Sequence, residues 1–446
     1  MKKISDMTEG SPTRHILTFA FPLIITNIGQ QLYMIADASI VGRCVGVKAL
    51  AAVGATDWLY FLILWTIVGL TQSISTYVSR YFGDRNFNAM NKAIAMCTLL
   101  CASIGAALTL AGLISASPML ELLNTPDDII DNAEIYFNTL ISGTLIVAAY
   151  NMAASVLRAL GNSRAPLIAM GISAFINIGL DLLFILVLKM NIFGAALASV
   201  LAQLVSFIYC FVVLKRIGIV SLGKSTWIID RKLMKSIISF GMPLALGYIV
   251  ISLGGVILQS TVNLRGSAFV AGYTATNKVY GLLECSAISL GIAASTFLSQ
   301  NYGAGKYKRV KEGIKTVSLI ALILSGAISV ISIALRNPLM ELFLNANEKG
   351  GAEAQRIAVY YLIVLSLYLS ILYLLHIFRN VLQAMEIASW SMLSGFAEFI
   401  SRVAMSKIII KYIGDNALFY AEPIAWFVAL LIVFIPYFYY RKKLLE

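Results

Sequence analysis

The feature that constrains this chain most is a series of apolar blocks, each about 20 residues or longer, that runs through nearly all of its 446 residues. A helix rises 1.5 Å per residue, so about 20 apolar residues cover the roughly 30 Å of hydrocarbon in a bilayer. A membrane β-barrel would show alternating runs of about ten residues instead. Hydrophobic residues make up 59% of the chain and charged residues 13%, against about 45–50% and about 25% in soluble domains. The sequence therefore predicts an all-α integral membrane protein.

Twelve blocks can be delimited, six on each side of a basic linker. They are expected at residues 16–41, 50–78, 93–116, 135–156, 166–188 and 192–214, and then at 237–264, 269–298, 314–335, 357–378, 390–410 and 418–440. We therefore expect an N-terminal six-helix bundle at residues 1–214, a cytoplasmic linker at 215–235 and a C-terminal six-helix bundle at 236–446.

The charge distribution indicates how the chain is oriented. The net charge is +12, which could point either to nucleic acid or to membrane orientation. Most of the 34 Lys and Arg residues fall in segments that are cytoplasmic when both ends of the chain are cytoplasmic. Because cytoplasmic loops of membrane proteins are enriched in Lys and Arg, we expect a multi-pass protein of the cell (inner) membrane with both termini cytoplasmic, and no nucleic acid partner.

The second half of the chain repeats the first at a shift of about 220 residues. Residues 19–23 (FAFPL) return as 240–244 (FGMPL), and 118–122 (PMLEL) return as 338–342 (PLMEL). Each half holds an even number of spans, so both halves enter the membrane from the same side and form parallel repeats. Such a duplication places a cavity between two similar bundles, which predicts transport by alternating access.

Carboxylates within the spans call for an explanation, because each costs about 2.5–3.5 kcal/mol on membrane-insertion scales. Five qualify: Asp37, Asp57, Asp181, Glu284 and Glu398. Asp57 is followed by Trp58, a residue typical of the membrane interface, so a solvated position and a cavity-lining position are both open for it.

The N-terminal bundle holds the stronger candidate site. Polar or polarisable residues share one face of the first span and are therefore expected to line a cavity and not to face lipid: they are Asn27, Gln30, Met34 and Asp37. In the fifth span Asn177 and Asp181 lie four residues apart, and the sixth span offers the hydroxyl of Ser199. Carboxylates with an amide and a hydroxyl can hold a proton or Na⁺, since hard cations prefer oxygen ligands. The alternative is that each group bonds a neighbouring helix.

In the C-terminal bundle Glu398 and Arg402 lie one helical turn apart, which favours a structural ion pair, with a place in the substrate cavity as the alternative. Glu284 shares a face with Asn277 and Gly291, and Lys278 lies nearby in sequence. These residues form either a second polar cluster or a contact to substrate.

His376, near the inner end of the tenth span, could titrate near neutral pH. As a lone histidine at the membrane interface, it is expected to be solvated instead.

Four segments resemble the bacterial and archaeal branch of the multidrug and toxic compound extrusion (MATE) transporters. They are residues 7–12 (MTEGSP), 30–33 (QQLY), 157–162 (LRALGN) and 177–181 (NIGLD). The resemblance covers nearly the whole chain. It implies twelve helices in two bundles that export organic, often cationic, compounds in exchange for H⁺ or Na⁺.

The resemblance also assigns roles to particular residues. Asp37, Asn177, Asp181 and Ser199 match the family's N-lobe cation site, which implies that Na⁺ could bind at the first three. The chain departs from the family pattern at Leu182, where many members place a proline. It also lacks the acidic residues in the seventh and tenth spans that bind Na⁺ in some branches.

Motif absences narrow the remaining alternatives. The chain has no GxxxxGK[ST], HExxH or GxSxG motif, so neither direct use of ATP nor an enzyme is expected, and no cofactor. We expect a monomer whose partners are small organic molecules and membrane lipid. A flippase for a lipid-linked precursor is the nearest alternative, and a large basic cavity would favour it. A membrane-embedded transferase would need a motif such as DDxxD, which the sequence lacks.

Overall fold

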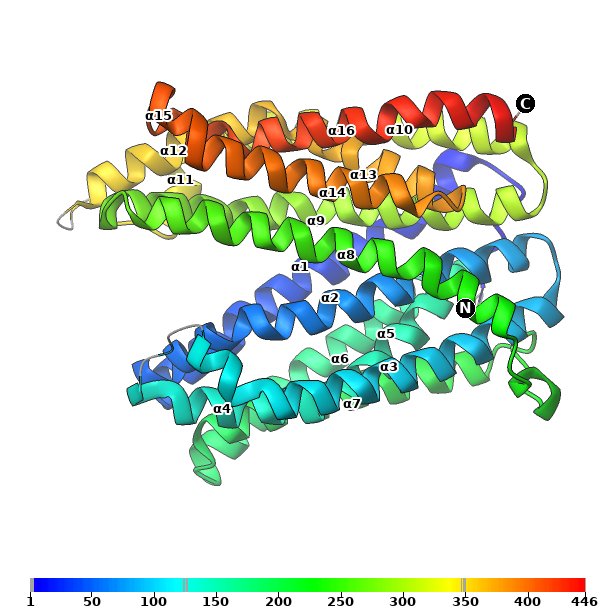
Figure 1. The fold of residues 1–446 in the computed structure, drawn as a ribbon, viewed down its shortest axis with the longest axis horizontal. Coiled ribbons are helices and arrows are strands. Elements are labelled where there is room, and N and C mark those ends of the chain that lie inside the picture. The colour runs from blue at the N-terminus through cyan, green and yellow to red at the C-terminus, as the bar shows by residue number, and fades with distance from the viewer. Residues whose placement is uncertain (1–3, 123–124, 126, 346, 348–349, 446) are drawn as a thin grey trace. The chain divides into compact units, whose positions relative to one another are not determined.

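The computed structural model describes residues 4–122, 125, 127–345, 347 and 350–445, and every regular element within these residues is a helix (Figure 1). Helices suit a bilayer because they satisfy the backbone N–H and C=O groups within one segment, where no water is present to do so.

Contacts divide the chain into two units. The first unit consists of residues 4–6 and 21–245, and the second of residues 7–20 and 246–445. The sequence places the end of the first bundle at residue 214 and the start of the second at residue 236. These two boundaries stay a prediction.

The first half of the chain begins with the longest helices and ends in the linker. Its elements are α1 (Pro12–Cys44), α2 (Val47–Gly83), α3 (Phe87–Leu122), α4 (Asp127–Ser142), α5 (Thr144–Ala159), α6 (Arg164–Asp181), the π-helix η1 (Leu182–Val187), α7 (Asn191–Lys215) and the 3₁₀-helix η2 (Lys224–Trp227). Within the first unit α6 and α7 pack side by side, as do α2 and α3. The linker is held to α3, because Asn91 donates to the carbonyl of Ile219 and accepts from the amide of Ser221.

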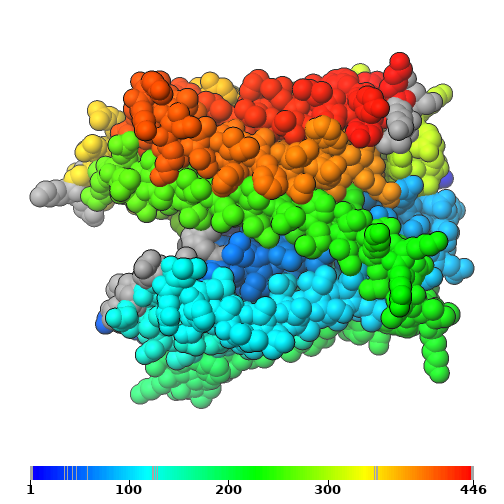
Figure 2. Space-filling view, viewed as in Figure 1, coloured from blue at the N-terminus to red at the C-terminus, as the bar shows by residue number. Residues whose placement is uncertain are grey.

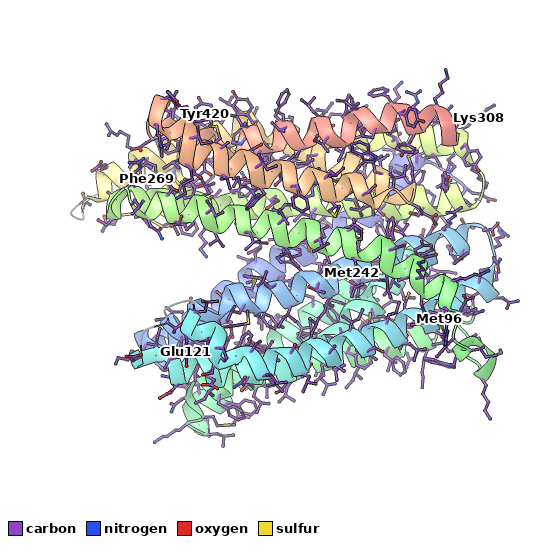
Figure 3. The ribbon with its side chains drawn as sticks, viewed as in Figure 1. Met96, Glu121, Met242, Phe269, Lys308 and Tyr420 are labelled. Atoms are coloured by element: carbon purple, nitrogen blue, oxygen red, sulfur yellow. The ribbon has the colours of Figure 1, made fainter. Side chains whose placement is uncertain are left out.

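The second half follows the same plan. Its elements are α8 (Arg231–Asn263), α9 (Ser267–Gly303), α10 (Tyr307–Ala334), α11 (Arg336–Glu341), α12 (Gly351–Leu367), α13 (Leu369–Ala384), α14 (Ala388–Val403), the π-helix η3 (Ala404–Ile409), α15 (Ile410–Ile413) and α16 (Asn416–Leu445). Helix α9 is central to the second unit, where it packs against α10, α12 and α13. Figure 3 shows Lys308 at the end of this unit where α10 begins, and Phe269 and Tyr420 near the opposite end.

Each half contains six helical paths long enough to cross a membrane. Among the described residues nine helices are long and apolar enough, and two bent pairs, α4 with α5 and α12 with α13, would each add one. The twelfth path runs without interruption from Ala388 through η3 to Ile413. It is divided into three elements and carries Glu398, Arg402 and Lys407.

Breaks in the helices recur at corresponding places in the two halves. The fourth span bends by 45° between α4 and α5, and the tenth bends by 49° between α12 and α13. The fifth and eleventh spans each end in a π-helical segment, η1 and η3. Both halves therefore place a bend in their fourth span and a π-helical segment, one of the usual causes of helix bending, at the end of their fifth.

Figure 2 shows residues of α3, α4, α8, α14 and α16 on the side toward the viewer. Large apolar side chains such as Leu110, Ile114 and Ile435 are exposed on these helices. Exposed apolar side chains on long helices are suited to contact with lipid.

Residues 7–10 are held by the ends of α9 and α10. The amide of Met7 donates to Gln300 Oε1 over 2.9 Å, and Asn301 Nδ2 donates to the carbonyl of Met7 over 3.1 Å. Lys306 Nζ donates to the carbonyl of Thr8 over 2.9 Å. The guanidinium of Arg309 donates to the carbonyls of Met7, Glu9 and Gly10. The backbone of this segment is therefore held by hydrogen bonds, of which those from Lys306 and Arg309 are charge-assisted.

The backbone conformation and close surroundings of Gly161 allow a test of the fold. This glycine has a φ of +76°, and a Cβ there would overlap the carbonyl oxygen of Ser5. We expect Gly161→Ala to lower the free energy of unfolding by at least about 1–2 kcal/mol, the cost of left-handed backbone alone for a residue with a side chain. Thermal unfolding of the purified protein in detergent measures the change. Gly171→Ala is the control, because nothing lies within 4 Å of a Cβ there, and a midpoint as low as that of Gly161→Ala would contradict the account.

Candidate functional site

Three helices of the first unit bring together the residues predicted for cation binding. Asp37 comes from α1, Asn177 and Asp181 from consecutive turns of α6, and Ser199 from α7. Asn177 Nδ2 donates to Ser199 Oγ over 3.3 Å. Both Asn177 and Asp181 are fully buried. The helical spacing of four residues explains why these two side chains point the same way.

The carboxyl groups of Asp37 and Asp181 lie close enough to interact directly. A hydrogen bond between them needs a shared proton, since two carboxylates can only accept. Without it, the buried oxygens Asp37 Oδ1, Asn177 Oδ1 and both Oδ atoms of Asp181 have no hydrogen-bond partner among the described residues. Buried acceptors are normally satisfied, so this oxygen set fits either a bound proton or a hard cation such as Na⁺.

Tyrosines complete the surroundings of this pair, and sequence reasoning missed them. Tyr33 lies one turn before Asp37, and its hydroxyl is 3.3 Å from Ser199 Oγ. Tyr136 of α4 is buried and interacts electrostatically with Asp37 and Asp57. The spacing of four residues between Tyr33 and Asp37 was the one available signal in the sequence. A tyrosine in an apolar block otherwise looks like packing.

The remaining candidates of the first unit differ in exposure. Asn27 is half-buried, whereas Gln30, Met34 and Asp57 have exposed side chains. Asp57 has an electrostatic interaction with Tyr136, so it is not an isolated charge. A role for these four residues in lining a substrate cavity stays a prediction.

Leu182, where the family pattern has a proline, begins the six-residue π-helix η1 directly after Asp181. The helix is therefore irregular next to the carboxyl pair even without a proline. π-helical segments occur frequently at functional sites.

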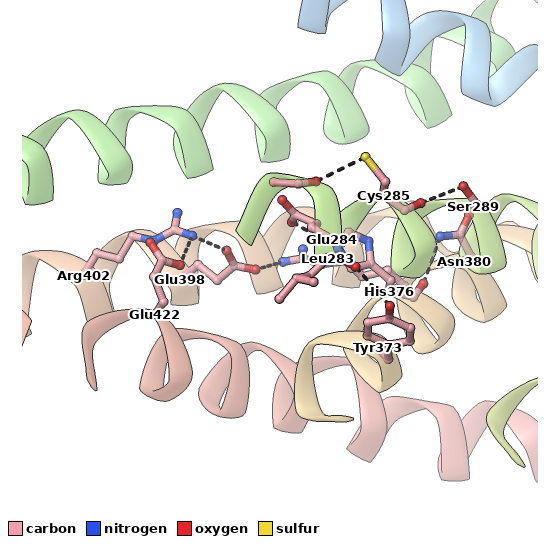
Figure 4. Close-up of polar contacts among 12 residues, drawn as sticks. Leu283, Glu284, Cys285, Ser289, Tyr373, His376, Asn380, Glu398, Arg402 and Glu422 are labelled. Carbon is pink, nitrogen blue, oxygen red and sulfur yellow. Dashed lines mark hydrogen bonds and ion pairs between the residues drawn. The ribbon is translucent and has the colours of Figure 1, made fainter. Parts of the chain in front are cut away.

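The second unit contains a continuous chain of buried ion pairs (Figure 4). Arg379 Nη2 lies 2.6 Å from Glu398 Oε1, Glu398 Oε2 lies 3.2 Å from Arg402 Nη2, and the same nitrogen lies 2.7 Å from Glu422 Oε2. The pair that the spacing of Glu398 and Arg402 favours is therefore formed. Sequence reasoning missed its two outer members, because Arg379 falls just beyond the end expected for the tenth span and Glu422 was not counted among the intramembrane acids.

The two arginines of this series of ion pairs also donate hydrogen bonds to other groups. Arg402 Nη1 donates to the carbonyl of Ile251 in α8 over 2.9 Å, and Arg379 Nε donates to Ser394 Oγ over 2.8 Å. Helices α8, α13, α14 and α16 are thus joined through four charged side chains. Partnered charges of this kind avoid the cost of an unpaired buried ion.

Glu284 and His376 form a separate pair in the same unit. His376 Nε2 lies 3.5 Å from Glu284 Oε1, and the imidazole side chain is 16% exposed. The expectation that His376 is a solvated interfacial histidine is therefore wrong, because α9 packs against α13 and brings a carboxylate to it.

The sequence predicted that Asn277, Glu284 and Gly291 share one helix face, and the structure contains part of this arrangement. A Cβ on Gly291 would lie 2.5 Å from Asn380 Nδ2, one turn beyond His376, so Glu284 and Gly291 both face α13. Asn277 hydrogen-bonds Tyr273. Lys278 instead lines a cavity of about 790 Å³ with Asn263, Thr274 and Phe343.

The ion-pair chain predicts a stability defect. Glu398 is 4% exposed and contacts two guanidinium groups, so Glu398→Gln leaves both arginines without that charge. We expect a loss of about 3–5 kcal/mol, as for other broken buried pairs, measured by thermal unfolding in detergent. Glu341→Gln, at an exposed position of α11, is the matched control and should unfold as the parent does. Equal unfolding midpoints for the two variants would refute a structural role for this series of ion pairs.

Comparisons with known proteins identify sequences similar to this chain. A family model described as MatE matches residues 22–183 and 243–409. The "Probable multidrug resistance protein YpnP" of Bacillus subtilis strain 168 is 29% identical over 310 residues, which are 69% of this chain and 69% of that protein. The "Probable multidrug resistance protein YoeA" of the same strain is 27% identical over 349 residues, or 76% and 75% of the two chains.

A solved structure supports the fold independently. The crystal structure of "MATE in complex with MaL6" superposes with a TM-score of 0.92 at 21% identity and covers 98% of each chain. The predicted all-α membrane fold of twelve helices in two repeats is therefore confirmed.

Proposed function

Because the chain belongs to the MatE family of multidrug efflux transporters, we propose that it exports organic, often cationic, compounds by antiport with H⁺ or Na⁺ through alternating access. The resemblance noted in the sequence is thereby confirmed, and the chain is a transporter, not an enzyme. The observation that carries the choice of coupling site is the Asp37–Asp181 pair with its unsatisfied buried oxygens.

In this proposal the pair holds the coupling ion. One proton shared between Asp37 and Asp181 removes a negative charge from a buried position and satisfies oxygens that otherwise lack a donor. Loss of that proton restores the charge, so the two states favour different helix packing around α1, α6 and α7. Export follows if the coupling ion and the substrate bind with opposite preference to the two orientations of the protein.

Sodium would use the same oxygens. Asp37, Asp181 and the amide oxygen of Asn177 would bind the ion, with the Ser199 hydroxyl available as a further oxygen. Carboxylate and amide oxygens are suitable ligands for a hard cation. Proton coupling does not need the amide oxygen, so Asn177 distinguishes the two ions.

The wider assignment follows the charge pattern and the apolar helices. We propose that the protein lies in the cell (inner) membrane as a monomer in contact with lipid, with both ends of the chain cytoplasmic and no nucleic acid partner. Residues 1–3 and 446, the termini themselves, lie outside the described residues.

The coupling site is tested by removing each carboxylate in turn. Asp37→Asn and Asp181→Asn should each abolish ethidium efflux from cells that lack their own pumps, because a neutral amide cannot exchange a cation. Glu121→Gln, an exposed acid of α3 in the same unit, is the control and should retain efflux. Membrane quantities are compared by immunoblot. Normal efflux in either Asp variant at equal membrane quantity would remove that residue from the mechanism.

The coupling ion is tested in proteoliposomes with a pH gradient and a Na⁺ gradient applied separately. If Na⁺ drives export, Asn177→Ala should raise the Na⁺ concentration needed for half-maximal transport by about tenfold, since it removes an oxygen ligand. If protons drive export, the pH dependence should remain in the same variant. Transport that neither gradient drives would refute antiport with these ions.

A further inference from the structure

The linker between α7 and α8 presents three large apolar side chains in succession on its surface. Trp227 ends the 3₁₀-helix η2 and is 38% exposed, and Ile228 and Ile229 follow it at 66% and 63%. Other apolar residues of the linker, Ile219 and Leu222 among them, pack against the hydrophobic core of the first unit. The linker therefore turns one set of apolar residues inward and another set outward.

The outward-facing residues are held in place by polar contacts on both sides. Trp227 Nε1 donates to the carbonyl of Leu222 over 3.3 Å. Asp230 follows the three apolar residues directly, and its carboxylate accepts from the amide of Leu233, in the first turn of α8, over 3.0 Å. The same carboxylate lies 2.9 Å from Lys92 Nζ of α3. Because both sides are held, the exposure of the apolar residues is a fixed feature of the surface.

A contact with α3 gives the depth of these residues relative to the apolar spans. The amide of Asp230 donates to Met96 Sδ over 3.3 Å, and Met96 is the fourth residue of the apolar block at 93–116. Figure 3 shows Met96 near the end of the first unit where α8 begins. Because the end of an apolar block marks the edge of the hydrocarbon, Ile228 and Ile229 lie near the boundary between acyl chains and headgroups. An outward-facing side chain at that depth meets lipid.

The charges around the three apolar residues favour an anionic surface. Residues 215–235 contain one acid, Asp230, whose carboxylate is paired with Lys92. The same residues contain six bases with exposed side chains, which are Lys215, Arg216, Lys224, Arg231, Lys232 and Lys235. Anionic lipid attracts basic segments next to a membrane, and tryptophan is enriched at the level of the headgroups. Exposed apolar side chains within a basic segment are typical of an interfacial membrane anchor.

We propose that residues 224–235, here called the linker anchor, bind anionic phospholipid at the membrane surface. The side chains of Trp227, Ile228 and Ile229 insert between the headgroups, and the surrounding Lys and Arg side chains bind the lipid phosphates. The linker anchor thus attaches the connection between the two repeats to the bilayer. This interaction is independent of the proposed antiport and of its coupling ion.

The test places a fluorescent label on the linker anchor of the full-length protein in lipid nanodiscs. Ile228→Cys is labelled with bimane in a Cys44→Ser background, because the other four cysteines are buried. The nanodiscs hold equal parts of phosphatidylglycerol and phosphatidylcholine, and in one of two samples the phosphatidylcholine is brominated near the top of its acyl chains. We expect the brominated lipid to quench about half of the emission or more, because interfacial side chains reach about 5–10 Å into this region.

A label outside the linker anchor is the matched control. Lys308→Cys lies at an exposed position of α10, six residues before the apolar block at 314–335 and so about 9 Å outside it. Its emission should be the same with and without bromine. The Cys44→Ser protein without an added cysteine should take up no bimane.

Removal of charge tests the choice of lipid. The fraction of emission that is quenched at residue 228 gives the equilibrium constant for insertion. This constant should fall about 25-fold in the double variant Lys232→Gln and Lys235→Gln, because each basic residue near an anionic surface contributes about fivefold. Nanodiscs of phosphatidylcholine alone should also lower it. The double variant Lys308→Gln and Lys311→Gln removes the same charge at the start of α10 and should leave the quenching unchanged.

Unquenched emission from residue 228 in the brominated mixture would overturn the proposal, and the apolar residues would then belong to a contact with another protein. Equal quenching in the mixture and in phosphatidylcholine alone would overturn the role of anionic lipid. Because Ile228 is exposed, its replacement leaves the core of the first unit intact. Efflux that persists in the Asp37 and Asp181 variants would refute the coupling site without affecting these results, so the two proposals fail independently.

Discussion

A carboxyl group surrounded by lipid-shielded helices must receive a proton, a cation or hydrogen-bond donors, because water is not there to solvate its charge. The two units meet this requirement in different ways. In the second unit Glu398 and Glu422 are neutralised permanently by arginines at 2.6–3.2 Å. In the first unit Asp37 and Asp181 face each other with oxygens that no described group satisfies. The first arrangement is neutralised within the protein, whereas the second leaves buried oxygens without a donor among the described residues.

The duplication explains why both arrangements occur in one chain. The two halves share a bend in the fourth and tenth spans and a π-helical segment at the end of the fifth and eleventh. The side chains beside these features differ, since Asp181 precedes the π-helix in the first half and Arg402 lies just before it in the second. One backbone plan therefore carries an unsatisfied carboxyl pair in one copy and a buried network of ion pairs in the other. Irregular backbone at membrane depth is tolerated because packed helices surround it.

Much of this structure could be predicted from sequence because it depends on local spacing. Block length predicts the spans, and the four-residue intervals of Asn177 with Asp181 and of Glu398 with Arg402 place each pair on one face. Contacts between helices were harder to predict from the sequence. The pairing of His376 with Glu284 and the contacts of Arg379 and Glu422 join residues 19 to 92 positions apart. No period in the sequence reports such contacts, because tertiary packing decides which faces meet.

The held segment at residues 7–10 has a consequence for biosynthesis. The amide of Met7 bonds Gln300, which is 293 residues further along the chain, and the donors of Arg309 follow still later. Residues 7–10 are translated before these partners, which lie 293 and 302 residues after Met7. Residues 7–10 therefore cannot form these bonds until α9 and the start of α10 have been made. This segment can dock only after α9 has been made, and a chain that stops before α9 leaves residues 7–10 without these hydrogen bonds.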